Sequence, residues 1–503
     1  MFANIRGVGL FGMNSFGVNV EVEISKGIEK LEIVGLGDTA VRESRERICS
    51  AFRSSGLKFP SGRVIVNLAP ADVKKSGSSN DLSIAVAVLA ATGYFNAESA
   101  SDSAFIGELS LGGDVRPVNG VLPMAVCSLK MGVKRLFVPA DNAREASVLD
   151  GVDVYGVSSL GELAAYLRGA AGMKRTPKYV PPPQSESGEP DFCDVKGQQF
   201  AKKALEVAAC GGHNLIMIGA PGSGKSLPSI LPGMTFEESI ETTNIYSIAG
   251  MLDKNSPLIT ARPFRSPHHT VSAAGLIGGG GIPRPGEISL AHNGVLFLDE
   301  LAEFDRSSLE ILRQPLEDGK VTISRAAGTV TYPCSIMLVA AMNPCPCGYH
   351  GHPKKKCTCT QRQVSQYLSK ISGPLLDRFD LHVEVAPVEY SSISSAKKEE
   401  SSAQIRERVQ RAREIQQNRF KGTHITCNAG ITAEILHEVC PLTEQAEQTL
   451  KDVFDRMGLS ARAYGRILKV SRTIADMDGS QMIDRKHIAQ AVRYRSLDRK
   501  YIE

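Results

Sequence analysis

The chain contains no tryptophan, and aromatic residues make up only 6% of its 503 residues. It also has no run of roughly 18 apolar residues, the length that a membrane-spanning helix needs. The first residues include no long apolar segment followed by a cleavage site, so no secretory signal is expected. These absences argue against a membrane or secreted protein, and we expect a cytoplasmic one.

Neither the cysteines nor the charge indicates a specialised class. Eleven cysteines, an odd number in a long chain, do not form the pattern of a secreted disulfide framework. The net charge of +4 permits nucleic-acid binding but is too small to require it. A hydrophobic fraction of 42% is ordinary for a globular protein, and the length predicts roughly three domains.

The fold class predicted from the pattern of elements is α/β. Residues 1–167 read as a small α/β domain, with alternating strands at 18–24 and 63–68 and a buried helix at 82–93 that ends at a glycine. Residues 168–190 are rich in proline and polar residues, which is typical of a linker.

The second half changes from mixed to helical. Residues 191–390 alternate strands with helices, and the apolar runs 214–218 and 295–298 predict fully buried parallel strands. Residues 391–503 are charged and helical, with candidate helices at 405–419, 446–457 and 463–477, and form a C-terminal helical domain.

A phosphate-binding motif follows the first of these buried strands. It consists of Gly219, Ala220, Pro221, Gly222, Ser223, Gly224, Lys225 and Ser226. The glycines let backbone N–H groups surround phosphate oxygens, Lys225 reaches the β- and γ-phosphates, and Ser226 binds Mg²⁺. The alternative is a plain glycine-rich turn.

Two later strands end in polar residues suited to nucleotide hydrolysis. Asp299 and Glu300 follow the strand at 295–298, where Asp299 would hold Mg²⁺ and Glu300 would polarise the attacking water. Asn343 ends a further buried strand and can reach the γ-phosphate or its water. For Asn343 the alternative is an Asn-Pro dipeptide that merely begins a turn.

Three arginines are candidates for contact with the γ-phosphate. Arg378 lies at an expected helix end and could act as an arginine finger on the nucleotide of a neighbouring subunit, or form a surface ion pair. Arg462 follows a serine at the start of a C-terminal helix, with Arg466 as a second candidate in the same helix. By itself, this pattern is nonspecific.

A cluster of thiols follows Asn343. Cys345, Cys347, Cys357 and Cys359 offer four sulfur ligands, which suit tetrahedral Zn²⁺. The C-x-C spacing is tighter than is usual in zinc sites, so reduced thiols or one disulfide pair are alternatives. Residues 354–356 of the same loop are lysines, which could contact a phosphate backbone or form a solvated tip.

Two further segments are inserted among the nucleotide-binding elements. One is glycine-rich, spans 275–285 and is expected to be flexible with Arg284 exposed; the other, 320–331, alternates like a hairpin with Arg325 near its turn. They could line a channel and grip a polymer, or be structural loops only.

Together these residues make the chain resemble the ComM/YifB family of magnesium-chelatase-like AAA+ ATPases. The resemblance extends over the whole chain and is most specific in segments 264–304, 343–359 and 372–385, with 495–499 also similar. It implies a central AAA+ domain with a parallel sheet, a C-terminal helical lid, and ATP with Mg²⁺ as cofactors.

The same resemblance implies how the protein works. Members of this clade form hexameric rings with ATP between subunits, in which Arg378 would act on the neighbour's nucleotide. The two inserted segments resemble insertions shared with magnesium chelatase and the minichromosome-maintenance helicases. We therefore expect a helicase-type motor for DNA branch migration in recombination or natural transformation, acting on single-stranded or branched DNA.

The first 167 residues resemble the protease domain of Lon, which has a ribosomal-S5-like α/β fold. Ser79 falls on the position of the catalytic serine of that domain, but residues 119–124, where its lysine partner would fall, contain no lysine. Because a serine without a base is a poor nucleophile, we expect a non-proteolytic domain.

One departure from the family lies directly after the phosphate-binding motif. Pro232 and Gly233 follow so closely that the helix after Ser226 is expected to span only about one turn, which weakens its dipole at the phosphates. Two alternatives to a DNA motor therefore remain open. They are a chelatase-like or chaperone-like remodeller of a protein partner, and a degenerate nucleotide-binding scaffold.

Overall fold

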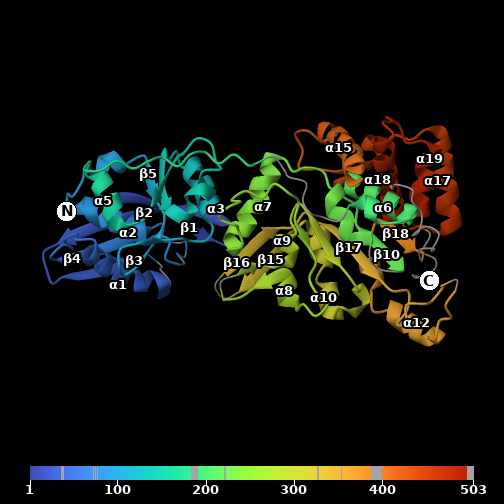
Figure 1. Cartoon of the computed structure of the whole chain (residues 1–503), viewed down its shortest axis with the longest axis horizontal. Helices are drawn as coiled ribbons and strands as arrows, with labels where there is room; N and C mark the ends of the chain where they lie inside the picture. Colours follow the sequence, from blue (N-terminus) through green and yellow to red (C-terminus); the bar gives the residue numbers. More distant parts are fainter. Residues whose placement is uncertain are drawn as a thin grey trace.

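The computed structural model describes residues 1–35, 39–71, 73, 75, 77–182, 191–219, 223–281, 283–325, 328–352, 354–386 and 399–495. An N-terminal α/β part, a central part with a parallel sheet and a C-terminal helical part lie side by side along the long axis (Figure 1). Ala220, Pro221 and Gly222 of the phosphate-binding motif, and residues 496–499 of the final segment, lie outside the described residues.

The N-terminal part is built on a seven-stranded mixed sheet in the order β3-β4-β2-β1-β5-β8-β9. Its strands are β1 (Phe2–Phe11), β2 (Asn14–Ser25), β3 (Lys30–Val34), β4 (Arg63–Ala69), β5 (Ser103–Phe105), β8 (Arg135–Pro139) and β9 (Asp153–Val157). A short antiparallel pair, β6 (Glu108–Leu109) and β7 (Val115–Arg116), lies apart from it. The strands expected at 18–24 and 63–68 are confirmed as parts of β2 and β4.

Five helices accompany this sheet. They are α1 (Thr39–Ser54), α2 (Asp81–Ala91), α3 (Val121–Lys130), α4 (Ala143–Ala146) and α5 (Leu160–Leu167). Every residue of α2 is buried, as its mainly apolar composition predicts, including Asp81 and Ser83, and Gly93 just beyond it has a positive φ of 74°.

The residues after α5 run back along the N-terminal part before the chain leaves it. Arg175 forms a β-bridge with Tyr155, and the Thr176 N–H donates to the Val154 carbonyl at 2.8 Å. The first half of the expected linker is thus held by backbone hydrogen bonds, while residues 183–190 lie outside the described residues.

The central part contains a five-stranded sheet in which every neighbouring pair is parallel, in the order β11-β14-β17-β10-β18. Its strands are β10 (Leu215–Gly219), β11 (Phe264–Arg265), β14 (Val295–Leu298), β17 (Met337–Met342) and β18 (Leu381–Val385). All residues of β14 and β17 are buried, which agrees with the apolar runs in the sequence. Helix α6 (Gln199–Gly211) precedes β10.

The segment after the phosphate-binding motif differs in kind from the expected single turn of α-helix. It forms an eight-residue 3₁₀ helix, η4 (Ser223–Ile230), with Pro228 inside it. The next helix along the chain is α7 (Phe236–Ala249). After Ser226 the helix continues only to Ile230, about one turn as expected, but it is a 3₁₀ helix and not an α-helix. The tighter i→i+3 winding spans about 2 Å per residue and tolerates the proline that an α-helix would not.

The inserted segments contain short regular elements. Around 275–285, helix α8 (Ala273–Ile277) leads into a two-stranded ladder of β12 (Gly278–Gly279) and β13 (Arg284–Pro285), and the expected flexibility of this segment stays a prediction. Arg284 is exposed, as predicted. The second segment is the predicted hairpin, formed by β15 (Lys320–Arg325) and β16 (Gly328–Pro333).

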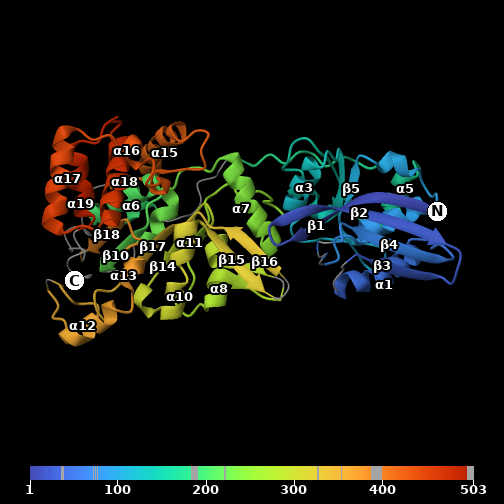
Figure 2. The same ribbon diagram turned by 180° about the vertical axis from the view of Figure 1, so that it is seen from behind.

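Short helices connect these elements. They are α9 (Glu287–Leu290), α10 (Arg306–Glu310), α11 (Arg313–Asp318), α12 (Gln361–Leu368) and α13 (Gly373–Leu376). Seen from behind in Figure 2, α12 projects below the end of the molecule that carries the C-terminal helices.

The C-terminal part is helical, as predicted. Its helices are α15 (Ser402–Arg419), α16 (Leu436–Val439), α17 (Glu444–Met457), α18 (Ala461–Met477) and α19 (Arg485–Arg493). The side chain of Ser401 begins α15 with a reciprocal capping box with Gln404. Within the part of the chain that the structure describes, no helix is both long and apolar enough to cross a membrane.

Candidate nucleotide site and metal centre

The carboxyl ends of three adjacent strands bring the predicted nucleotide-binding residues to one edge of the central sheet. Ile218 pairs with Met342, and Leu298 pairs with Ala340. Gly219 directly follows Ile218, Asn343 directly follows Met342, and Asp299 directly follows Leu298. Because the strands are parallel, all three leave the sheet on the same side, which is where ligands bind in open α/β sheets.

Gly219 opens the phosphate-binding motif in a conformation that only glycine adopts easily. Its φ is 138°, and a Cβ atom there would lie 2.2 Å from the Val385 carbonyl oxygen. The turn out of β10 is therefore fixed by backbone contact with β18. The side chains of Ser223, Gly224 and Lys225 lie outside the described residues, whereas Ser226 is buried.

The 3₁₀ helix η4 is held by a helix of the C-terminal part. The Ser229 carbonyl accepts hydrogen bonds from Nε and Nη2 of Arg406 at 2.9 and 2.6 Å, and the Ser229 hydroxyl lies 2.7 Å from the hydroxyl of Ser402. Leu227 and Ile230 are fully buried beneath it. The geometry after the motif thus depends on α15, which lies about 170 residues further along the chain.

The two acidic residues after β14 occupy different surroundings. Asp299 accepts a hydrogen bond from the Glu300 N–H at 3.1 Å and is half-buried. Glu300 has a positive φ of 54°, which is uncommon for a residue other than glycine, and its carboxylate is exposed. His269 lies 3.4 Å away, from Nδ1 to Glu300 Oε2.

Asn343 lies half-buried at the end of β17, beside the turn that leads into the cysteine cluster. A Cβ atom at Gly348 would lie 3.8 Å from Asn343 Oδ1, so the cysteine loop folds back over this side chain. The residue is thus placed at the nucleotide edge and is linked directly to the loop that follows it.

Arg378 lies at the opposite edge of the sheet. Its backbone carbonyl accepts from Asn214 Nδ2 at 3.0 Å, just before β10 begins. Its guanidinium pairs with Glu317 and donates from Nη1 to the Pro374 carbonyl at 3.1 Å. In one copy of the chain, Arg378 therefore forms an ion pair at the edge away from the phosphate-binding motif.

Arg466 reaches the same edge from α18. Its Nε lies 3.5 Å from Asp380 Oδ1, while the other carboxylate oxygen of Asp380 lies 3.2 Å from Nδ1 of the fully buried His213. Burial opposes ionisation of Asp380, but the His213 hydrogen bond and nearby cations lower its pKa below the ordinary value. Asp380 thus remains an anion that orients Arg466.

One donor of Arg466 is unused. Its Nη1 is buried and has no hydrogen-bond partner within the described part of the chain, and burial lowers the pKa of the guanidinium. Arg462 lies one turn earlier in α18 and is exposed. Of the two candidates in this helix, Arg466 is the one held in a fixed position.

The predicted site is therefore divided between two edges of the sheet. β10 has five residues, so its ends lie roughly 13 Å apart at about 3.3 Å per residue. Gly219, Asp299 and Asn343 occupy the carboxyl edge. Arg378 and Arg466 occupy the amino edge.

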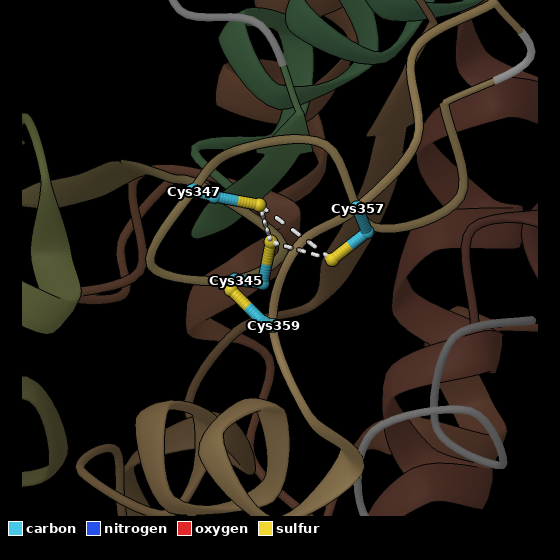
Figure 3. A group of neighbouring side chains, drawn as sticks. All are labelled: Cys345, Cys347, Cys357 and Cys359. Carbon is cyan, nitrogen blue, oxygen red and sulfur yellow. Dashed lines mark hydrogen bonds between the residues drawn. The ribbon is translucent and has the colours of Figure 1, made fainter.

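The four cysteines after Asn343 converge on one point (Figure 3). Their sulfur atoms all lie within 4.8 Å of one another. Cys345 and Cys347 lie 3.4 Å apart, Cys347 and Cys357 3.5 Å, and Cys345 and Cys357 3.8 Å, from sulfur to sulfur. All four are free thiols, and a disulfide would need about 2.05 Å between sulfurs.

These separations fit a tetrahedral metal ion. Four sulfurs at about 2.3 Å from Zn²⁺ lie about 3.8 Å from one another, close to the distances observed. Backbone hydrogen bonds from Tyr349 and Thr358 lower the pKa of Cys347 to about 5, whereas burial and the neighbouring thiols raise the pKa values of Cys357 and Cys359. The fit to a metal therefore rests on the sulfur geometry. The residues present therefore fit zinc.

The histidines and lysines of this loop have other contacts. The backbone N–H of His350 donates to Cys345 Sγ at 3.3 Å, and His352 Nδ1 accepts from two backbone N–H groups at 3.0 Å. The ammonium of Lys355 lies 4.8 Å from the centre of the Tyr349 ring. The basic tip is thus partly packed on an aromatic residue.

Three functional contacts were not predicted from the sequence. They are His269 beside Glu300, Glu317 paired with Arg378, and the His213–Asp380 pair that orients Arg466. His269 lies 31 residues before Glu300 in the sequence, and no spacing rule connects the two. The other two depend on tertiary packing and leave no local signal.

In the N-terminal part, Ser79 directly precedes Asn80, the N-cap of α2, and is largely buried. Its backbone carbonyl accepts a hydrogen bond from the Gly107 N–H at 2.8 Å. Residues 121–124, at the start of α3, are buried and carry no titratable side chain. That this domain is non-proteolytic stays a prediction.

A glycine-rich loop after strand β10 of a parallel sheet, acidic residues after β14, two strands away, and a helical C-terminal part are typical of the P-loop nucleotide-binding class. Family models agree in three segments: "Magnesium chelatase, subunit ChlI" over residues 191–393, "Subunit ChlI of Mg-chelatase" over 20–142, and "Magnesium chelatase, subunit ChlI C-terminal" over 399–495. The chain belongs to the ComM/YifB family of magnesium-chelatase-like AAA+ proteins.

Relatives match along almost the whole length. The chain is 42% identical over 499 residues to the uncharacterized protein YifB of Escherichia coli, covering 98% of this chain and 96% of that protein. It is 41% identical over 491 residues to the competence protein ComM of Haemophilus influenzae, covering 96% and 95%. Lon protease 2 of Bacillus subtilis is 34% identical over 164 residues, 29% of this chain and 28% of that protein.

Proposed function

We propose that this protein is an ATP hydrolase that works as a hexameric ring and drives movement along DNA. The observation that carries the proposal is the division of the site between the two edges of the sheet. In a ring of identical subunits, the amino edge of one subunit would face the carboxyl edge of the next.

The residues take complementary roles at such a shared site. The motif 219–226 would surround the phosphates, with Ser226 and Asp299 holding Mg²⁺ and Lys225 at the β- and γ-phosphates. Glu300 would polarise the attacking water and Asn343 would orient it. Mg²⁺ when bound supplies charge neutralisation at the phosphates.

The neighbouring subunit would contribute its arginines. Arg378 is available once it exchanges Glu317 for a phosphate, because Glu317 is itself exposed and loses little in solvent. The unpaired Nη1 of Arg466 suits a second phosphate oxygen, a role assigned to Arg462 from the sequence. Arg378 and Arg466 would together stabilise the charge on the transferring phosphoryl group.

DNA as the substrate rests on the family and on exposed basic groups. Arg284 and Arg325 lie on the two inserted segments, and both are exposed. A Cβ atom at Gly279, which pairs with Arg284, would lie 3.3 Å from Arg325 Nη2, so the two segments meet. Two guanidinium groups that lie close together are suited to bind the phosphates of a nucleic acid backbone.

Zinc is proposed as a structural ion at the four cysteines. The loop from Cys345 to Cys359 leaves the sheet directly after Asn343 and folds back over it. A bound ion would fix this loop, and through it the position of the Asn343 amide.

A second candidate function follows from η4. The 3₁₀ winding after the motif differs from the α-helix that supports phosphates in this class. This difference favours a scaffold that binds nucleotide without hydrolysing it. The observation against it is the direct support that α15 gives to η4 through Arg406 and Ser402.

The test is ATP turnover measured without DNA, with single-stranded DNA and with branched DNA. We expect turnover that rises several-fold with DNA. ATP turnover that does not change when DNA is added would contradict the DNA motor and favour a remodeller of protein partners. Nucleotide binding without any turnover would favour the scaffold. Lys225→Ala provides the inactive control.

A further inference from the structure

The N-terminal part contacts the central part at two places, and the first joins α3 to α7. The Gly120 N–H donates to the Ser247 carbonyl at 3.2 Å, and the Ser247 hydroxyl donates to the carboxylate of Glu145. Leu122 and Leu258 belong to a small buried cluster between the two parts. Both views of the ribbon show α3 beside α7 (Figures 1 and 2).

The second contact joins the turn between β1 and β2 to the hairpin β15–β16. A Cβ atom at Gly12 would lie 2.2 Å from Cγ1 of Val330, and one at Gly328 would lie 2.7 Å from Cζ of Phe11. Phe11 also packs against the core cluster that contains Val330 and Tyr332. The approach is so close that glycine is needed on both sides.

Both contacts are made with one connected unit of the central part, which consists of α7 and the two inserted segments. The Tyr332 hydroxyl at the base of the hairpin donates to the Pro283 carbonyl of the first inserted segment at 2.8 Å. The Tyr246 hydroxyl of α7 donates to the Leu290 carbonyl of α9 at 2.9 Å, directly after that segment. Helix α7 and both inserted segments are therefore connected, and the N-terminal part holds this unit at both ends.

The supported hairpin keeps a polar face open. Thr322 and Thr331 face each other at 3.1 Å, and Ser324 and Thr329 at 3.2 Å, between hydroxyl oxygens, and all four residues are exposed. The N-terminal part packs against the tip and the apolar side, where Val330 lies. It therefore leaves free the face that carries the four hydroxyl groups, whereas Arg325 lies on the face of Ile323 and reaches toward Gly279 of the first inserted segment.

We propose that the N-terminal part is a brace that fixes the orientation of the β15–β16 hairpin toward a phosphate-bearing strand. Hydroxyl groups in a row suit hydrogen bonding to the successive phosphates of a nucleic acid backbone. This step rests on the proposed function for the identity of the partner. The brace itself rests only on the contacts of Phe11, Gly12 and Ser247.

The brace gives the N-terminal part a role that needs no catalysis at Ser79. A hairpin that is also held at Gly328 and Val330 transmits the motion of the ATP-binding sheet to the strand it contacts. In this account the N-terminal part contributes rigidity and no chemistry.

The test compares Phe11→Ala with Phe2→Ala. Both remove a phenylalanine from β1, but Phe2 is exposed at the far end of the strand and serves as the matched control. We expect Phe11→Ala to raise hydrogen exchange in residues 320–333 at least several-fold and to reduce DNA stimulation of ATP turnover, with unstimulated turnover unchanged. Phe2→Ala should behave as the unaltered protein.

A second variant tests the contact on the side of α3 and α7 without changing a core residue. Asp141 and Lys254 form an exposed ion pair across the two parts, 2.6 Å from Nζ to Oδ2. Asp141→Lys should also raise hairpin exchange, and the charge-swapped double variant Asp141→Lys with Lys254→Asp should restore it.

Unchanged hairpin exchange in Phe11→Ala, with correct folding shown by circular dichroism, would overturn the brace. Increased exchange with full DNA stimulation would overturn its role toward the strand. If the unaltered protein shows no DNA stimulation while exchange still rises in Phe11→Ala, the DNA motor is rejected and the brace is retained.

Discussion

At the scale of single residues, the site depends on where each charged group is held. Glu300 is exposed in a left-handed conformation beside His269, whereas Asp299 is half-buried at the strand end. These positions suit Glu300 to act on water and Asp299 to act on the metal ion. Substitutions of these two neighbouring acids are therefore expected to impair different steps, activation of water for Glu300 and binding of the metal ion for Asp299.

Glu300→Gln should lower ATP turnover by about 10²–10⁴-fold while nucleotide binding is retained, because the amide keeps the size of the side chain but is a poor base. Steady-state turnover and nucleotide affinity measured on the same preparation would check this. Asp299→Asn is the comparison, since it should weaken Mg²⁺-dependent binding as well. Unchanged turnover in Glu300→Gln would remove this residue from the mechanism.

Arg378→Ala should lower turnover by about 10³-fold or more and leave nucleotide affinity nearly unchanged, because the arginine would act only on the transferring phosphoryl group of a neighbour. Glu317→Gln offers the matched control, because it frees Arg378 from its ion pair without removing it. If Arg378→Ala retained full turnover, Arg378 would be only a structural partner of Glu317.

At the scale of elements, η4 depends on the lid. Arg406→Ala should weaken nucleotide binding roughly tenfold, because two charge-assisted hydrogen bonds to the Ser229 carbonyl are lost and η4 loosens. Titration with a fluorescent nucleotide would measure the change. Arg411→Ala, on the exposed side of the same helix, should have little effect. Equal affinities in all three proteins would show that η4 is stable without the lid.

The cysteine loop is expected to hold about one zinc ion per chain, measured by elemental analysis of the purified protein. Cys345→Ser should lose the metal and lower the midpoint of thermal unfolding by roughly 5 °C or more, because metal binding contributes to folding. Cys193→Ser, outside the cluster, should change neither quantity. A metal-free unaltered protein would refute the site.

Much of the fold could be predicted, because the strands of the central sheet are short apolar runs that end in functional residues. Strands β10 and β14 and helix α2 match their predicted positions closely. The 3₁₀ form of η4 could not be predicted, since Ser402 and Arg406 stabilise it from a distant segment. The orientation of Arg466 by Asp380 and His213 likewise arises only when α18 packs on the sheet.

At the scale of the whole molecule, neither edge of the central sheet is a complete site. The phosphate-binding motif, Asp299 and Asn343 lie at one edge, and Arg378 and Arg466 lie at the other. Complete sites would form only where two copies meet. Activity should therefore depend on protein concentration, because dilution separates the copies.

The most direct test of this arrangement mixes two inactive variants. Lys225→Ala lacks the phosphate-binding lysine, and Arg378→Ala lacks the arginine of the opposite edge, so each alone should be nearly inactive. A mixed ring contains interfaces that combine an intact motif from one variant with an intact Arg378 from the other. The account predicts that mixing restores a measurable part of the ATP turnover. A mixture that forms joint assemblies yet remains as inactive as its components would contradict it.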